Sequence, residues 1–290
     1  MSIRQEFARW LLPPAILHLA RTARFRLGRL AHMGAEDRSL LRATRQLARR
    51  HQGSRCFILG SGSSISRQDL RKLRGEFVLS VSNAYVHPDY AFFRPRYHCM
   101  PPILASHGQA YPLERFVDWL REMEAGTADA EMFFHIGDRS WIEQEGLFRG
   151  RTMHWVDYCP WAGEPFAAFD LANLPNIWSV SELALCAAVF MGFERIYLLG
   201  IDHDWFNGPL IHFYDPATEH KLRPDSAALA FADAEFQMRR HAEIFRKYKI
   251  LQSIHGSIFN ANTDPRHYLD VFPRADYASL FDTAASDRRP

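Results

Sequence analysis

Cysteine is scarce in this sequence, and its spacing excludes the usual cysteine-based scaffolds. The 290 residues include four cysteines and no C-x-x-C pair. A zinc ribbon needs closely spaced pairs and is excluded, and four widely spaced cysteines lack the density of a disulfide scaffold. We expect the four to be small core residues in a reducing compartment, at positions Cys56, Cys99, Cys159 and Cys186.

The sequence also lacks a hydrophobic run long enough to cross a bilayer, which takes roughly 18 residues. The nearest candidate, residues 10–20, is broken by Pro13 and Pro14 and is followed by arginines instead of a small-residue cleavage site. This pattern predicts neither a transmembrane helix nor a signal peptide. We therefore expect a cytoplasmic protein.

Acidic residues are rare at the amino-terminal end. Residues 1–55 hold twelve arginines against three acidic residues, a net charge of +9, although the whole chain carries +2. Apolar residues recur on one face, which predicts a basic amphipathic helical extension over residues 1–53. Its residues 1–50 either lie on an anionic membrane surface or pack on the domain or a second subunit, so a homo-oligomer is compatible with the sequence. No nucleic-acid-binding module is recognisable, and we expect no nucleic-acid partner.

No internal repeat or low-complexity linker interrupts residues 54–290, which we assign to one α/β domain. Short apolar runs alternate there with helical segments, the clearest being residues 181–191 and 225–247. This alternation predicts a Rossmann-like, mostly parallel sheet with helices on both faces. The predicted strands are residues 56–59, 77–81, 97–100, 132–136, 152–156, 195–199 and 250–254.

A turn rich in glycine and serine follows the first predicted strand, in the segment CFILGSGSSIS. Backbone amides of such a turn, together with a helix amino terminus, are typical of phosphate sites. The spacing is not that of the dinucleotide motif, because Ile65 replaces its third glycine, and there is no Walker lysine. The alternative is a turn without a ligand, in which Ser63, Ser64 or Ser66 caps a helix over residues 68–73.

Two further strand ends carry small or polar residues. Asn83 follows the second strand, where its amide suits a pyrimidine edge or a ribose hydroxyl. Ser179 or Ser181 is placed to cap a helix that Gly192 ends, and the strand over residues 195–199 leads into Gly200, Ile201 and Asp202. Since ligands of parallel sheets bind at the carboxyl ends of strands, we predict one cleft at these three ends.

These motifs, in this order, resemble those of the bacterial Rossmann-type sialyltransferases and of a related group similar to 6-hydroxymethylpterin diphosphokinase. In the sialyltransferases a G-x-G-x-S turn follows the first strand, an asparagine follows the second, T-S-G opens a small-residue helix, and G-I-D follows the next strand. The similarity covers roughly residues 54–282, and the carboxyl-terminal tail is more similar to the diphosphokinase-like group.

The resemblance implies a CMP-activated sugar donor. Because CMP leaves as a monophosphate, whose modest charge hydrogen bonds and a helix amino terminus can accommodate, we expect no required metal or other cofactor. The donor-binding residues that the resemblance implies would be Gly60, Ser61, Gly62, Ser63, Ser64, Asn83, Ser179, Val180, Ser181, Gly200 and Ile201. His255, which follows the last predicted strand, is a further candidate for contact with the donor.

The resemblance also implies a catalytic histidine in a segment after G-I-D. His212 is the matching residue, with Tyr214 contacting the phosphate, Asp202 as a further catalytic candidate, and residues 203–226 as a lid. A histidine titrates near neutral pH and is suited to act as the general base. The alternative, an ATP-dependent diphosphokinase, would need Mg²⁺ on Asp202 and Asp204. A non-catalytic binding protein of the same fold is a second alternative.

The sequence therefore predicts a cytoplasmic glycosyltransferase that works in bacterial surface polysaccharide or lipooligosaccharide synthesis. Sialic acid, another nonulosonate and 3-deoxy-octulosonate are compatible donor sugars. The expected acceptor is a lipid-linked glycan, and the basic extension would hold the enzyme at the inner face of the membrane.

Overall fold

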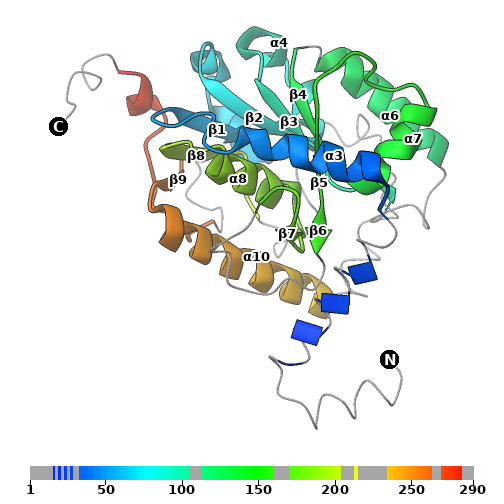
Figure 1. Cartoon of the computed structure of the whole chain (residues 1–290). Helices are drawn as coiled ribbons and strands as arrows, with labels where there is room; N and C mark the ends of the chain where they lie inside the picture. Colours follow the sequence, from blue (N-terminus) through cyan, green and yellow to red (C-terminus); the bar gives the residue numbers. More distant parts are fainter. Residues whose placement is uncertain are drawn as a thin grey trace.

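The strands of the protein form a parallel sheet in the order β5-β4-β3-β2-β1-β8-β9 (Figure 1). This computed structural model describes residues 33–104, 113–127, 129–159, 170–203, 212–214, 234–262 and 269–282, with isolated positions between 16 and 28. The seven strands are β1 Arg55–Leu59, β2 Phe77–Val81, β3 Tyr97–Cys99, β4 Glu131–His135, β5 Met153–Val156, β8 Arg195–Leu199 and β9 Ile258–Asn260. A separate pair joins β6 Tyr158–Cys159 and β7 Leu174–Pro175.

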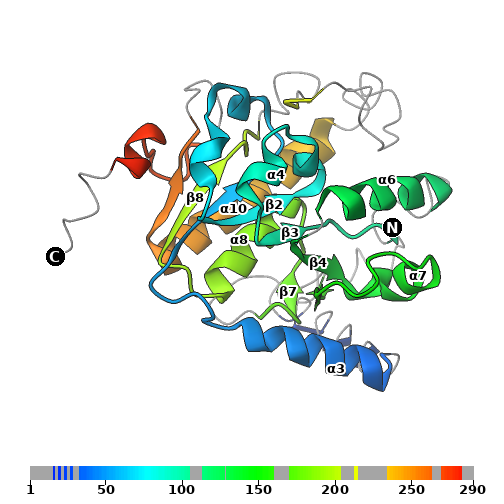
Figure 2. The same ribbon diagram turned by 90° about the horizontal axis from the view of Figure 1, so that it is seen from above.

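Helices cover both faces of the sheet, which confirms the predicted fold class. On one face, α8 (Val180–Phe190) packs on β1, β2 and β3 and lies between the sheet and α10 (Ala234–His255) (Figure 1). On the other, α6 (Leu113–Gly126) and α7 (Arg139–Gln144) pack on β4 and β5, and α4 (Tyr90–Phe93) packs nearer β1 and β2. Figure 2 shows α6 and α7 at the end of the sheet away from β8.

The continuous apolar runs of the strands follow from this double burial. Along β1, Cys56 and Ile58 join the core under α8, while Phe57 and Leu59 join the core on the opposite face. All four are fully buried. The buried thiols of Cys56, Cys99 and Cys186 confirm that these cysteines are core residues, and burial raises the pKa of each.

Residues 35–53 of the predicted extension pack on the sheet. The helix α3 (Ala35–Thr44) lies against β5, and Leu47, in the turn that follows, is buried in the core beneath α8. At the amino-terminal edge of the sheet, Arg50 donates to the buried carboxylate of Glu131, and His51 is hydrogen-bonded to the hydroxyl of Tyr97 at 2.7 Å. The arginine-rich residues before 33 lie largely outside the described residues. Among the described helices, none is long and apolar enough to cross a bilayer.

Two predicted elements are wrong. Residues 250–254 are not a strand but the last turn of α10, because Ile244, Tyr248 and Leu251 are spaced for one buried helix face. Gly256, with φ of +77°, ends that helix before β9 begins. The helix predicted over residues 68–73 is replaced by two short 3₁₀ segments, Ser63–Arg67 and Leu70–Leu73.

Candidate functional site

The candidate site lies at the carboxyl ends of β1 and β8. From β1 the chain adds β2, β3, β4 and β5 on one side and then crosses to β8 on the other, so the strand order reverses between β1 and β8. Open α/β sheets bind ligands at such a reversal, outside the carboxyl ends of the strands. The turn after β1 and the residues after β8 meet at this point.

The glycines of the turn allow β1 and β8 to stay paired beyond their ends. The amide of Gly60 donates to the carbonyl oxygen of Leu199 and that of Gly62 to the carbonyl oxygen of Gly200, both at 2.8 Å. A Cβ atom at Gly60 would collide with the carbonyl oxygen of Gly200. Gly200 itself has φ of +63°, which favours glycine. Close packing of two backbones therefore explains glycine at both positions.

A carboxylate of the chain occupies the turn where a phosphate was predicted. Asp202, which is 4% exposed, accepts from the amide of Ser64 at 3.1 Å, from its hydroxyl at 2.5 Å, and from the side-chain amide of Asn262 at 3.2 Å. These bonds tie the ends of β1, β8 and β9 together. The predicted serine cap is wrong, because no side chain caps Ser63–Arg67 and Asp69 caps the next segment. The Ser64 amide is thus used within the protein.

His212 contacts the turn after β1 from a distant segment and lies beside Ser61. The two segments form an antiparallel bridge at Gly62, and the amide of Phe213 donates to the carbonyl oxygen of Ser61 at 3.1 Å. His212 Nδ1 lies 3.2 Å from that carbonyl oxygen and 3.1 Å from Ser61 Oγ. Since a carbonyl oxygen only accepts, this geometry favours a proton on Nδ1 and a lone pair on Nε2. The lone pair that a base needs is therefore on Nε2, which is buried in this structure.

Tyr214 connects His212 to the end of β2. Its ring stacks on that of His212, with centroids 4.8 Å apart and planes 11° apart, and its hydroxyl accepts from Asn83 Nδ2 at 3.0 Å. Asn83 is only 2% exposed, and its Oδ1 accepts from Trp119 Nε1 at 2.7 Å. Sequence reasoning missed Trp119, since a tryptophan on the buried face of an amphipathic helix carries no signal of a polar contact.

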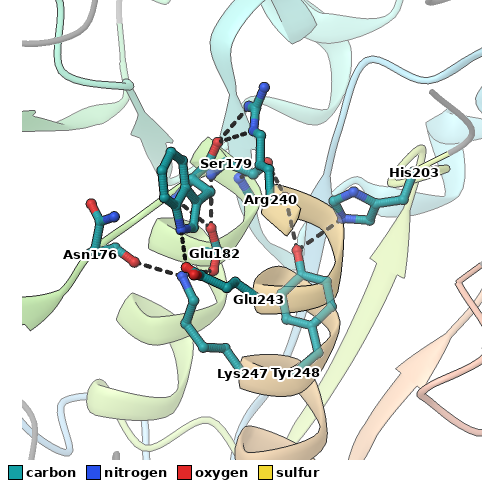
Figure 3. Close-up of polar contacts among 10 residues, drawn as sticks. Asn176, Ser179, Glu182, His203, Arg240, Glu243, Lys247 and Tyr248 are labelled. Carbon is teal, nitrogen blue, oxygen red and sulfur yellow. Dashed lines mark hydrogen bonds and ion pairs between the residues drawn. The ribbon is translucent and has the colours of Figure 1, made fainter. Parts of the chain in front are cut away.

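Polar residues also link the amino end of α8 to the end of β8 (Figure 3). Ser179 caps α8, as predicted, in a capping box with Glu182. The hydroxyl oxygens of Ser179 and Ser181 are 2.7 Å apart, and that of Ser181 is 2.9 Å from the hydroxyl of Tyr248. The same tyrosine hydroxyl lies 3.1 Å from Nε2 of His203, the residue after Asp202. These bonds tie the start of α8 to the end of β8, which is the third predicted strand end.

Charged side chains of α8 and α10 surround this amino end, and sequence reasoning missed them. Glu182, 1% exposed, accepts from the backbone amides of Trp178 and Ser179 and forms an ion pair with Lys247. Arg240 donates to the carbonyl oxygen of Trp178. Figure 3 shows Arg240 and Lys247 reaching from α10 toward the start of α8, where Glu182 lies. As at the turn, a carboxylate of the chain takes amides that a bound anion would otherwise use.

Burial sets the charge state of this region. Desolvation, helped by His241 and Arg240, lowers the pKa of His203 to about 3, so this ring is neutral at physiological pH. Burial raises the pKa of Glu182, an effect that Lys247 opposes. His203 also has φ of +49°, an uncommon conformation for a residue with a side chain. The end of β8 is therefore held by several contacts at once.

The structure does not bring His255 to this site. It is the last residue of α10, before β9, and its Nε2 is 2.7 Å from the carbonyl oxygen of Phe193, which precedes β8. Both positions belong to the amino-terminal edge of the parallel sheet. The prediction that His255 follows a strand on the cleft side is wrong, because the run before it is helical.

Parts of the predicted lid lie outside the described residues. Of residues 203–226 the structure describes His203 and the three residues 212–214, and Asp204 is not among them. Within the part of the chain that is described, no group of three or more histidine, cysteine, aspartate or glutamate side chains is arranged to hold a metal ion.

Comparison with known proteins gives distant structural similarity. No protein-family model matches the chain, and no curated protein matches it in sequence. The MAf glycosyltransferase of Magnetospirillum magneticum AMB-1 matches at a TM-score of 0.39 with 16% sequence identity. The match covers 78% of this chain and 36% of that one, so this chain spans about a third of the length of the protein it matches. At this TM-score the similarity carries no argument about function.

Proposed function

We propose that the protein is a glycosyltransferase that uses a CMP-activated acidic sugar. The observation that carries the proposal is the pairing of His212 with Ser61 and of Tyr214 with Asn83 at the carboxyl edge of the sheet. A loop distant in sequence thereby delivers a base and a hydroxyl to the ends of β1 and β2. The order of motifs along the chain favours CMP as the nucleotide.

In the proposed reaction, His212 acts as the general base. Its Nε2 takes the proton of an acceptor hydroxyl while that oxygen forms a bond to the anomeric carbon of the donor sugar. The bond between this carbon and the phosphate oxygen breaks, and CMP leaves with the electron pair. Tyr214 donates a hydrogen bond to the phosphate as its charge increases. The contact of Nδ1 with the Ser61 carbonyl oxygen stabilises the protonated ring that results.

We propose that the reaction needs no metal ion. CMP leaves as a monophosphate, whose charge hydrogen bonds can accommodate. A diphosphokinase would instead concentrate more charge and need Mg²⁺ on carboxylates. Asp202 is a poor candidate for that role, because its oxygens already accept from Ser64 and Asn262. Its contacts support a role in joining strand ends.

The proposed acceptor is a lipid-linked glycan of the bacterial surface, and the proposed donor sugar is sialic acid, another nonulosonate or 3-deoxy-octulosonate. We place the membrane contact in the arginine-rich residues before 33, because residues 35–53 pack on the sheet. Removal of residues 1–32 should abolish co-sedimentation with vesicles that contain anionic lipid. Unchanged co-sedimentation would contradict the membrane contact.

The reaction is tested by following CMP release from CMP-linked acidic sugars in the presence of a glycan acceptor. The His212→Ala variant should release CMP about 10²–10⁴-fold more slowly, the loss expected for a missing general base. His255→Ala is the matched control, since the same substitution at the opposite edge should leave the rate unchanged. Wild-type rates in His212→Ala, or no CMP release by the wild-type protein, would contradict the proposal.

A further inference from the structure

Trp119 is buried beside the candidate site but does not reach the surface. It is 1% exposed, lies on α6, and packs in the core that covers β4 and β5. Its indole nitrogen donates to Asn83 Oδ1 at 2.7 Å. An indole N–H can donate but cannot accept, so the Asn83 atom that faces it must be the oxygen. The orientation of the Asn83 amide is therefore fixed by chemistry.

The fixed Asn83 amide in turn determines whether the Tyr214 hydroxyl accepts or donates the hydrogen bond between them. With Oδ1 directed to the indole, Asn83 presents its NH₂ group to the Tyr214 hydroxyl at 3.0 Å. An amide nitrogen donates only, so the tyrosine oxygen accepts this bond. The hydroxyl proton of Tyr214 is then directed to another acceptor. Trp119 on α6, Asn83 at the end of β2 and Tyr214 therefore form a chain of hydrogen bonds in which each residue donates to the next group.

We propose that Trp119 is a positioning residue that makes Tyr214 a hydrogen-bond donor toward an anionic oxygen of the ligand. Asn83 is too buried to recognise a nucleotide directly, and it acts through Tyr214. The ligand group at this position is an acceptor, such as a phosphate oxygen. The identity of that ligand as CMP rests on the proposed function, whereas the direction of the hydrogen bonds does not.

The test is a double-mutant cycle on Trp119→Phe and Tyr214→Phe, measured by calorimetry with CMP and, separately, with inorganic pyrophosphate, without Mg²⁺. Each single variant should weaken anion binding by about 3–10-fold, the effect of one lost hydrogen bond. The double variant should bind no more weakly than Tyr214→Phe, because Trp119 acts only through the tyrosine. Trp141→Phe is the matched control, since Trp141 is buried in the same core. It should bind as the wild-type protein does.

Additive losses in the double variant, or equal losses in Trp119→Phe and Trp141→Phe, would show that Trp119 only fills the core and would overturn the proposal. Binding of pyrophosphate but not CMP, with the same non-additive cycle, would support the positioning role and contradict the proposed donor. Binding of neither anion by the wild-type protein would overturn both.

Discussion

At the scale of single residues, the turn after β1 is shaped by what the chain itself places there. Asp202 accepts hydrogen bonds from Ser64, and Gly60 leaves room for the carbonyl oxygen of Gly200. A glycine–serine sequence after a strand is typical of phosphate sites, but here it also satisfies an internal carboxylate. The same glycine and serine residues therefore also serve strand pairing. Within the turn, the half-buried Ser61 contacts His212.

Replacement of Gly60 tests the close approach of the two backbones. Gly60→Ala should lower the free energy of unfolding by about 1–3 kcal/mol, because the new methyl group forces β1 and β8 apart. Urea denaturation measures this loss. Gly28→Ala is the matched control, since a Cβ there meets no atom within 4 Å, and its stability should equal or slightly exceed that of the wild-type protein. Equal stability of Gly60→Ala and wild type would contradict the packing argument.

The sequence was sufficient to find residues that carry a local motif. Ser61, Asn83 and Ser181 follow strands or begin a helix. In the structure, residues 212–214 contact Ser61 and Asn83, and Asp202 joins the end of β8 to the turn after β1. Trp119 was missed, because its role depends on a partner that only the tertiary structure supplies. The contacts of Asp202 were missed for the same reason.

At the scale of secondary structure, the strands were easier to predict than the helices. Buried parallel strands are short and apolar throughout, so their ends are marked by the polar or glycine residues that follow. The last turn of α10 shares that composition and was mistaken for a strand. The helical spacing of its buried residues can be recognised only together with the preceding turns, where Ile244 and Tyr248 define the buried face.

The start of α8 depends on the buried pair of Glu182 and Lys247. Lys247→Met should lower the free energy of unfolding by about 3–5 kcal/mol at pH 7, because a carboxylate is left buried without its cation. Glu182 already has a raised pKa, and a raised acid pKa means that the folded state binds the proton more readily. The deficit relative to wild type should therefore shrink as the pH falls from 7 to 5.

Urea denaturation of both proteins at each pH measures that deficit. The matched control is Glu235→Gln on the same helix, because Glu235 pairs with Arg239 in the open, with both side chains more than three-quarters exposed. Its effect should stay within about 0.5 kcal/mol. A similarly small effect of Lys247→Met would contradict the assigned role of the buried pair.

At the scale of the whole molecule, the two edges of the sheet differ in what they hold. The amino-terminal edge carries Glu131 with Arg50, Arg96 and His154, which fasten the segment after α3 to the strands. The carboxyl edge carries the contacts of Ser61, Asn83 and His203. This division supports a structural role for the first edge and a ligand site at the second.

Buried histidines should make the protein sensitive to acid. Burial lowers the pKa of His98 and of His203 to about 3 each, while an unfolded histidine titrates near 6.5. The unfolded state therefore binds more protons below pH 6.5, and stability falls as the pH decreases, by about 1.4 kcal/mol per pH unit for each residue. Urea midpoints from pH 7.5 to 5 measure this slope.

The His203→Asn variant separates this effect from general acid destabilisation. Asparagine tolerates the positive φ at this position and does not titrate, so the slope below pH 6.5 should be shallower than in the wild-type protein. An unchanged slope would mean that His203 does not contribute.

The most direct test of the central claim is a thermal-shift measurement with CMP, CDP, UMP, UDP, GDP and ATP, each with and without Mg²⁺. A ligand that binds the native state raises the melting temperature by mass action. If the carboxyl edge of β1, β2 and β8 holds the donor of a CMP-sugar transferase, CMP without Mg²⁺ should give the largest shift, and His212→Ala should retain most of it. A shift with ATP and Mg²⁺ alone, or with none of the six, would contradict the account.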